Sequence, residues 1–165
     1  MAKDQSFDVV SQVDLQEVDN AVQQASKELV QRYDLKDTGS TITLDKSAAS
    51  VTVTAPSDFV FKQVQDVLST KLVRREIDLK AVNWGKVEAA SGGSVRCTGT
   101  IVNGIDAEIA RTINKDVRDQ KYKVKVQIEG DKVRVFSASR DELQAVITFL
   151  KSKDYGIPLQ FNNYR

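Results

Sequence analysis

The sequence contains no histidine and one cysteine among its 165 residues. Without histidine the chain cannot form a Ser-His-Asp or Cys-His catalytic arrangement, nor a zinc site with histidine ligands. One cysteine can form neither an intramolecular disulfide nor a thiolate zinc site, which favours a reducing compartment. Cys97 lies in the alternating segment 95–101, where we expect a small buried hydrophobe rather than a nucleophile. The sequence therefore predicts no metal, no cofactor and no enzymatic activity.

Long apolar runs are also missing. No stretch approaches the roughly 20 residues of a membrane-spanning helix. The first six residues are polar and lead straight into a strand pattern, so no signal peptide is visible. Together with the single cysteine, these features predict a cytoplasmic protein without a membrane partner.

Net charge is only +1, but it is unevenly distributed. Residues 1–85 contain 10 Lys and Arg against 13 Asp and Glu, and residues 86–165 contain 14 against 10. Global charge therefore gives no reason to expect DNA binding, whereas the second half alone could attract an anion.

Part of the sequence occurs twice, as a strand pattern, a serine and an amphipathic helix pattern. An ungapped overlay pairs Val51 with Val133, Val53 with Val135, Ser57 with Ser139, Val64 with Val146, and Leu68 with Leu150. A repeat of this length indicates two copies of one small α+β module.

Both copies follow the order βαββαβ, which is typical of ferredoxin-like domains. The first has strands at 7–11, 41–44, 50–54 and 78–82, with helices that begin after Asp14 and Ser57. The second has strands at 95–101, 122–128, 132–136 and 158–162, with helices capped by Asn103 or Asp106 and by Ser139. Asp14 with Glu17, and Ser139 with Glu142, have the spacing of capping boxes. We therefore predict an α+β fold of two modules, residues 1–86 and 94–165, joined by a turn or hinge around Gly92 and Gly93.

In such a module two helices cover one face of an antiparallel sheet and leave the other face open. Side chains alternate across a strand, so Val124, Val126 and Ile128 are expected to face the helices. The residues that then face away are Lys121, Lys123, Lys125, Gln127, Lys132, Arg134 and Phe136. Cations pair with phosphate and an exposed ring can stack on a base, so these residues are the predicted nucleotide or nucleic-acid site.

The corresponding face of the first module is neutral, because Thr52 and Thr54 occupy the positions of Arg134 and Phe136. We therefore assign the ligand to the second module, and changing Lys123, Lys125 and Arg134 to Glu would test this. Four more cations are peripheral candidates: Lys115, Arg118, Arg140 and Arg165. Lys and Arg also keep exposed strands soluble, so an ordinary solvated surface remains an alternative.

Several segments resemble the YajQ family of bacterial proteins, in matching order and spacing over nearly the whole chain. They are Ser6–Ser11, Pro56–Phe59, Lys123–Val135, Ser139–Gln144 and Pro158–Arg165. The resemblance implies two RNP-like domains that exchange their first strands, so that residues 7–11 join the second sheet and residues 95–101 the first. It also implies a non-enzymatic protein that binds GTP, ATP, cyclic di-GMP or RNA, including tRNA.

Three functions follow from these observations. The preferred one is nucleotide or RNA binding on the basic face of the second module. The second is a cyclic di-GMP-responsive effector that changes shape at a hinge and contacts a protein or DNA partner. The third is a structural or interaction module that binds no nucleotide. Steep salt dependence would indicate RNA binding, because phosphate contacts release counterions.

Overall fold

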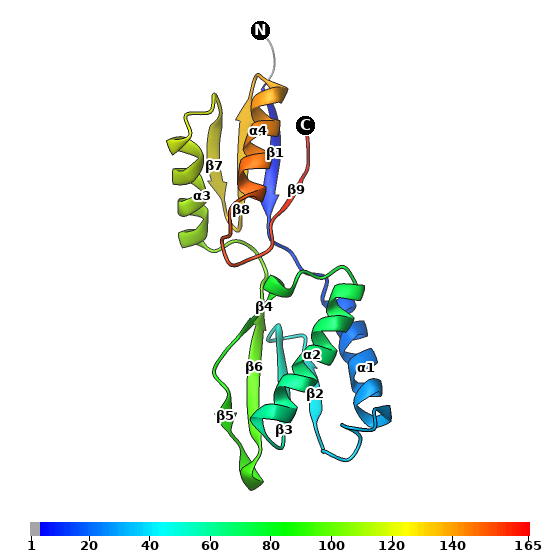
Figure 1. Ribbon diagram of the computed structural model, residues 1–165. Coiled ribbons are helices and arrows are strands. Elements are labelled where there is room, and N and C mark those ends of the chain that lie inside the picture. The colour runs from blue at the N-terminus through cyan, green and yellow to red at the C-terminus, as the bar shows by residue number, and fades with distance from the viewer. Residues whose placement is uncertain (1–3) are drawn as a thin grey trace. The chain divides into compact units, whose positions relative to one another are not determined.

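The computed structural model describes residues 4–165 (Figure 1). Four α-helices alternate with short strands along this part of the chain. The first half contains β1 (Gln5–Val10), α1 (Leu15–Gln31), β2 (Thr41–Asp45), β3 (Ser50–Ala55), α2 (Asp58–Arg74), a 3-10 helix (Leu79–Ala81) and β4 (Val82–Trp84). The second half contains β5 (Glu88–Ala89), a 3-10 helix (Ser91–Gly93), β6 (Val95–Ile101), α3 (Ala107–Asp119), β7 (Lys125–Glu129), β8 (Lys132–Ser137), α4 (Arg140–Lys151) and β9 (Gln160–Asn162).

The strands form two antiparallel sheets. One has the order β7-β8-β1-β9, and the other has the order β2-β3-β6-β4, with β5 also paired to β6. In each sheet one of the two central strands, β1 or β6, comes from the other half of the sequence, as an exchange of first strands would produce. The predicted α+β fold of two ferredoxin-like modules is confirmed.

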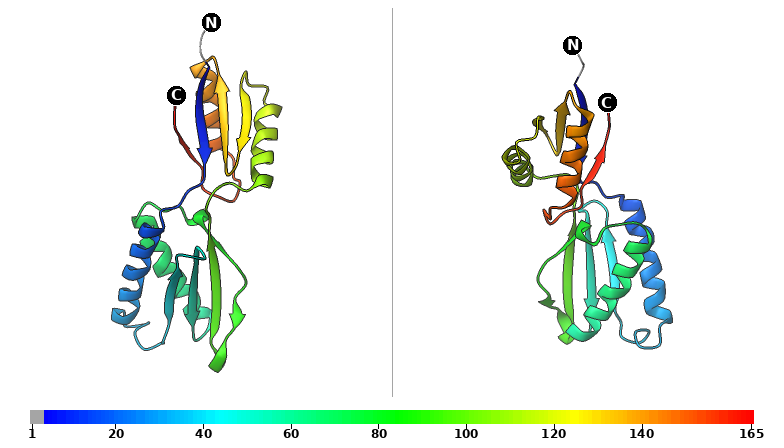
Figure 2. Two further views of the ribbon diagram at one scale, coloured as in Figure 1. Left: turned by 180° about the vertical axis from the view of Figure 1, so that it is seen from behind. Right: turned by 45° about the horizontal axis from the view of Figure 1, so that its top comes forward.

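The chain divides into two compact units. We call Val13–Val102 the N-terminal unit, and the described residues up to Gln12 together with Asn103–Arg165 the C-terminal unit. In the C-terminal unit α4 lies in front of the sheet in Figure 1 and behind β1 and β8 in the reversed view of Figure 2. One face of this sheet is therefore covered by helix and the other is left open.

Each helix begins at the polar residue expected from the sequence. The side chains of Asp14, Ser57, Asp106 and Ser139 accept hydrogen bonds from backbone N–H groups of the first turns of α1 to α4, at 2.8–3.3 Å. Asp106 rather than Asn103 caps α3. Each cap satisfies a donor that the helix itself leaves unpaired.

Each unit has its own apolar core between helices and sheet. In the C-terminal unit, Phe7 and Val9 of β1 are fully buried beside Val133 and Val135 of β8. In the N-terminal unit Cys97 is buried among β-strand and helix side chains, and its Sγ lies 3.3 Å from the Gly85 carbonyl oxygen. Cys97 is therefore buried as the sequence predicts, and its burial raises the pKa of the thiol.

The turn predicted at Gly92 and Gly93 is present, but it does not join the two units. Both glycines lie in the exposed 3-10 turn between β5 and β6, inside the N-terminal unit. Their φ angles of 72° and 78° explain why glycine occurs there, since a tight turn needs left-handed backbone. The chain passes between the units at residues 12–13 and 102–103 instead.

Gly104 is held against the β7–β8 hairpin. Its N–H donates to the Ser11 carbonyl at 2.6 Å, and the next N–H, of Ile105, donates to the Asp131 carbonyl at 2.9 Å. Its φ is +93°, and a Cβ added here would lie 2.7 Å from the Asp131 Cβ.

We expect Gly104→Ala to lower the free energy of unfolding of the C-terminal unit by about 2 to 3 kcal/mol, through backbone strain and steric overlap. Gly130→Ala is the matched control, because Gly130 also has positive φ but open space around it. The control should lose about 1 kcal/mol. Equal losses in urea denaturation would show that the Asp131 contact contributes nothing.

Candidate functional site

The face of the C-terminal sheet opposite the helices carries most of the predicted site residues. Register pairs Lys125 of β7 with Phe136 of β8, and Gln127 with Arg134. Lys125 and Gln127 are exposed, while Lys132, Arg134 and Phe136 are half-buried. We call these five residues, together with Asp8 of β1, the open sheet face.

The sequence predicts a strand from residue 122, with Lys121 and Lys123 facing the same way as Lys125, but β7 begins only at Lys125. Lys121 lies in the turn after α3, with φ of 59°, and both lysines are exposed. The Lys123 carbonyl accepts from the Ser137 hydroxyl at 2.9 Å, and its N–H donates to Glu142 at 3.2 Å. The side chains of Ser137 and Glu142 thus take the Lys123 backbone groups that would otherwise pair with β8, so β7 starts later than the sequence predicts.

The centre of the open sheet face is a carboxylate that the sequence analysis did not identify. Asp8 lies opposite Arg134 in the β1–β8 register, and its side chain is only 3% exposed. Arg134 Nε donates to Asp8 Oδ1 at 2.8 Å, and Asn163 Nδ2 donates to Oδ2, also at 2.8 Å. Lys132 Nζ lies 3.7 Å from Oδ2. Asp8 therefore fixes two of the predicted phosphate-binding cations against the sheet.

The ionisation of this cluster follows from its contacts. Burial alone would raise the pKa of Asp8, but hydrogen bonds from Arg134 and Asn163 and the positive charges of Arg134 and Lys132 outweigh it. The pKa of Asp8 is therefore below its ordinary value. The hydrogen bond to Asp8 likewise raises the pKa of Arg134. Both groups are charged near neutral pH, and Arg134 Nη1 also lies 3.3 Å from Glu129 Oε2.

This pairing changes how the face can act on a ligand. Asp8 and Glu129 offset much of the charge of Lys132 and Arg134, whereas Lys125 has no ion pair within residues 4–165. Over the described residues of the C-terminal unit, 12 Lys and Arg face 11 Asp and Glu, a smaller excess than the second half of the sequence alone has. Changing Arg134 to Glu would place two carboxylates side by side, so this substitution tests folding rather than binding.

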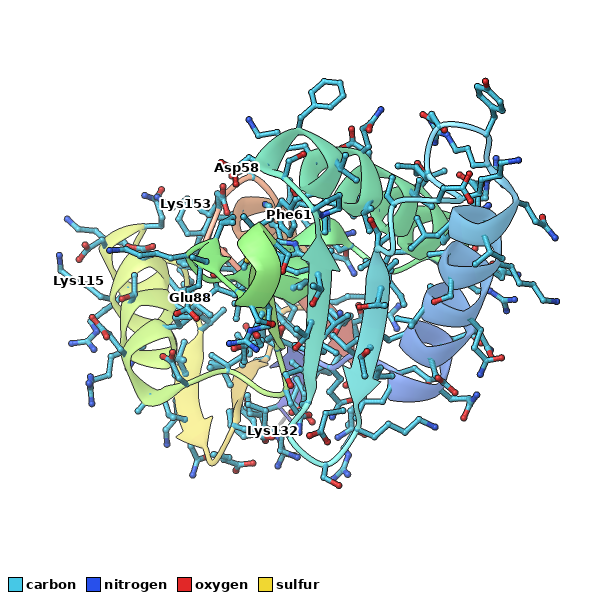
Figure 3. The ribbon with its side chains drawn as sticks, turned by 90° about the horizontal axis from the view of Figure 1, so that it is seen from below. Asp58, Phe61, Glu88, Lys115, Lys132 and Lys153 are labelled. Atoms are coloured by element: carbon cyan, nitrogen blue, oxygen red, sulfur yellow. The ribbon has the colours of Figure 1, made fainter. Side chains whose placement is uncertain are left out.

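The two peripheral candidates on α3 do not lie on the open sheet face. Lys115 is exposed, and its side chain projects outward from α3 (Figure 3). Arg118 lines a hollow of about 290 Å³ with Tyr122, Val124 and Val126, on the helix side of β7. Both can add to the electrostatic field of the unit, but neither shares a surface with Lys125 and Phe136.

The other two peripheral candidates come together. Arg140, the first residue of α4, and Arg165 line one hollow of about 420 Å³. Its other walls come from Gln5, Ser6, Leu143, Gln144 and Tyr164. Ser6 also pairs with Phe136 in the β1–β8 register, so the hollow begins beside the end of the open sheet face.

Within the part of the chain that the structure describes, no three His, Cys, Asp or Glu side chains group in a way that could hold a metal ion. Over the same residues, no helix is both long and apolar enough to cross a bilayer.

Comparison with known proteins identifies the family. A family model described as "Nucleotide-binding protein YajQ-like" matches residues 5–165. The chain belongs to the YajQ family. It is 48% identical over 165 residues, the full length of both chains, to a nucleotide-binding protein of Alkaliphilus oremlandii (strain OhILAs). It has the same identity, over the same full length, to nucleotide-binding proteins of Bacillus cereus (strain AH187) and Bacillus anthracis (strain CDC 684 / NRRL 3495).

The YajQ-family match confirms the resemblance drawn from the five sequence segments. The names of these relatives describe nucleotide binding and no reaction. They do not say which nucleotide is bound, or where.

Proposed function

We propose that this protein is a cytoplasmic, non-enzymatic protein that binds a nucleotide or single-stranded RNA on the open sheet face of its C-terminal unit. The observation that carries the proposal is the pairing of Lys125 with Phe136 on adjacent strands. It places a cation without an ion-pair partner among the described residues next to an aromatic ring, on a face that no helix covers. Membership of the YajQ family, whose relatives are named nucleotide-binding proteins, supports the ligand class.

The groups on this face divide by role. Lys125, with Lys121 and Lys123 in the exposed turn before β7, would attract phosphate. Phe136 would stack on a base, which favours no particular sequence because every base has a π face. Gln127 is exposed two residues further along β7, opposite Arg134, and would donate to or accept from a base or sugar. Arg134 and Lys132 are already hydrogen-bonded or paired to Asp8, so they form the rigid floor of the face.

We expect Lys125→Glu to weaken binding of a short single-stranded RNA by about tenfold at low salt, because it replaces a phosphate contact by a repulsion. The slope of log affinity against log salt should fall by about 1. Fluorescence anisotropy with labelled RNA at low and physiological salt measures both quantities.

Lys62→Glu is the control with the same charge change, because Lys62 is exposed on α2 of the N-terminal unit. It should leave affinity almost unchanged at physiological salt. If both variants weaken binding equally, only net charge matters and the open sheet face is not the site.

A further inference from the structure

The hollow beside α4 has the form of a small-molecule site. Its volume of about 420 Å³ lies within the range of ligand pockets, roughly 300–1,000 Å³. One apolar wall is the side chain of Leu143, which is 5% exposed and belongs to the core. The other is the ring of Tyr164, which is 59% exposed. Such a space, with apolar walls and a few polar groups, suits a flat ring.

The walls are held in place by the sheet. The chain after β9 turns at Asn163, where φ is 57°, and then pairs again with β1. Ser6 N–H donates to the Arg165 carbonyl at 3.1 Å, and Arg165 N–H donates to the Ser6 carbonyl at 3.0 Å. The Tyr164 ring centroid lies 6.2 Å from that of buried Phe7. The Tyr164 ring and the Arg165 backbone are therefore positioned before any ligand arrives, which lowers the entropic cost of binding.

The side chains that line the hollow favour an anion. Arg140 and Arg165 form no ion pair with any residue from 4 to 165. Of the two acids that follow Arg140, Glu142 already accepts a hydrogen bond from Lys123 N–H, and Asp141 is exposed. The amides of Gln5 and Gln144 add groups that both donate and accept.

We propose that this hollow is a second binding site, distinct from the open sheet face, for one planar ring that carries a phosphate or carboxylate group. The ring lies between Tyr164 and Leu143, and the anionic group meets the guanidinium groups of Arg140 and Arg165. Gln5 and Gln144 bond the polar edge of the ring. A nucleoside monophosphate and a simple aromatic carboxylate share this chemistry. The site does not depend on the proposed function, because none of its side chains belongs to the open sheet face.

The test is an NMR titration of the full chain with four compounds: adenosine 5′-monophosphate, 4-hydroxybenzoate, adenosine and inorganic phosphate. We expect saturable shifts of the Leu143, Gln144 and Arg165 amides with at least one of the two ring anions. Adenosine and phosphate alone should each bind at least about tenfold more weakly, because adenosine lacks the anionic group and phosphate lacks the ring. A response to the monophosphate only identifies a nucleotide site, and a response to both identifies a site for aromatic anions in general.

Variants separate this site from the open sheet face. Arg140→Gln removes the charge and Tyr164→Leu removes the ring but keeps its apolar bulk, so each should weaken the ring anion by about tenfold. Lys125→Gln should leave its affinity unchanged. The proposal fails if neither ring anion gives saturable shifts, if phosphate alone binds as well, or if the shifts follow residues 125–136 and respond to Lys125→Gln. Loss of RNA affinity in Lys125→Glu would still support the open sheet face in each of those cases.

Discussion

Arg134→Met is expected to lower the free energy of unfolding of the C-terminal unit by about 2 to 3 kcal/mol. The change keeps most of the side-chain length but leaves Asp8 buried without its shortest ionic partner. Removing one member of a fully buried pair costs about 3–5 kcal/mol, and a smaller loss is expected here because the Arg134 side chain is 20% exposed. Hydrogen exchange of the β1 and β8 amides measures the loss within this unit.

Lys132→Met is the matched control, since Lys132 Nζ approaches the same carboxylate at 3.7 Å from a side chain that is 36% exposed. It should cost under about 1 kcal/mol, as surface pairs do. The double variant Asp8→Asn with Arg134→Met should recover part of the loss, because no buried charge then lacks a partner. Equal effects of Arg134→Met and Lys132→Met would contradict the geometry described for Asp8.

The Asp8–Arg134 pair also makes the stability of the C-terminal unit depend on pH in acid. Because the pKa of Asp8 is lowered in the folded state, its contribution to stability is complete above the unfolded-state pKa of about 4. That contribution is lost as pH falls below this value, through the folded-state pKa. Asp8→Asn should therefore flatten the stability profile below about pH 4 while lowering stability at neutral pH.

Phe136→Leu is expected to weaken binding of a short single-stranded RNA by about tenfold at physiological salt. Stacking of one base on an aromatic side chain contributes about 1–3 kcal/mol, and leucine keeps the apolar bulk without the π face. Phe136 is half-buried beside Ser6 and Lys125, so leucine should preserve the strand pairing. Unlike the effect of Lys125→Glu, this loss should not change with salt, because no charge is altered.

Phe59→Leu is the control, because Phe59 is 73% exposed on α2 of the N-terminal unit. It removes an exposed ring from the protein without touching the open sheet face. Equal losses in the two variants would show that any exposed ring assists binding. If Phe136→Leu binds the RNA as well as the original protein does, stacking on Phe136 does not contribute to binding and only the charged side chains do.

The fold was predictable from the sequence because its signals are local. The strand and helix periods, the four capping residues and the repeat of Val51 and Val53 as Val133 and Val135 each act over a few residues. The first difference arose at Lys123, where the Ser137 hydroxyl and the Glu142 carboxylate take the backbone groups of a predicted strand. The alternation of lysine and valine around residue 123 gives no sign of these hydrogen bonds, because the two side chains lie 14 and 19 residues away in the sequence.

The electrostatics of the site were less predictable, because they depend on residues from both ends of the chain. Asp8 and Arg134 are 126 positions apart, and Asn163 lies at the opposite end from Asp8. The alternation of Ser6-Phe7-Asp8-Val9 did place Asp8 on the side away from the core, and the resemblance placed this strand in the second sheet. Combining the two would have identified the pair. The hollow at Arg140 and Arg165 had no comparable signal, since it depends on the left-handed turn at Asn163.

The most direct test of nucleotide binding on the open sheet face is an NMR titration of the full chain with GTP, ATP, cyclic di-GMP and a short single-stranded RNA. Backbone amide shifts are followed at low and physiological salt. The proposal predicts saturable shifts concentrated in β7, β8 and the neighbouring residues of β1 for at least one ligand, retained at physiological salt and reduced in Lys125→Glu. Shifts confined to the N-terminal unit, or shifts that scatter over both units and vanish on adding salt, would contradict it.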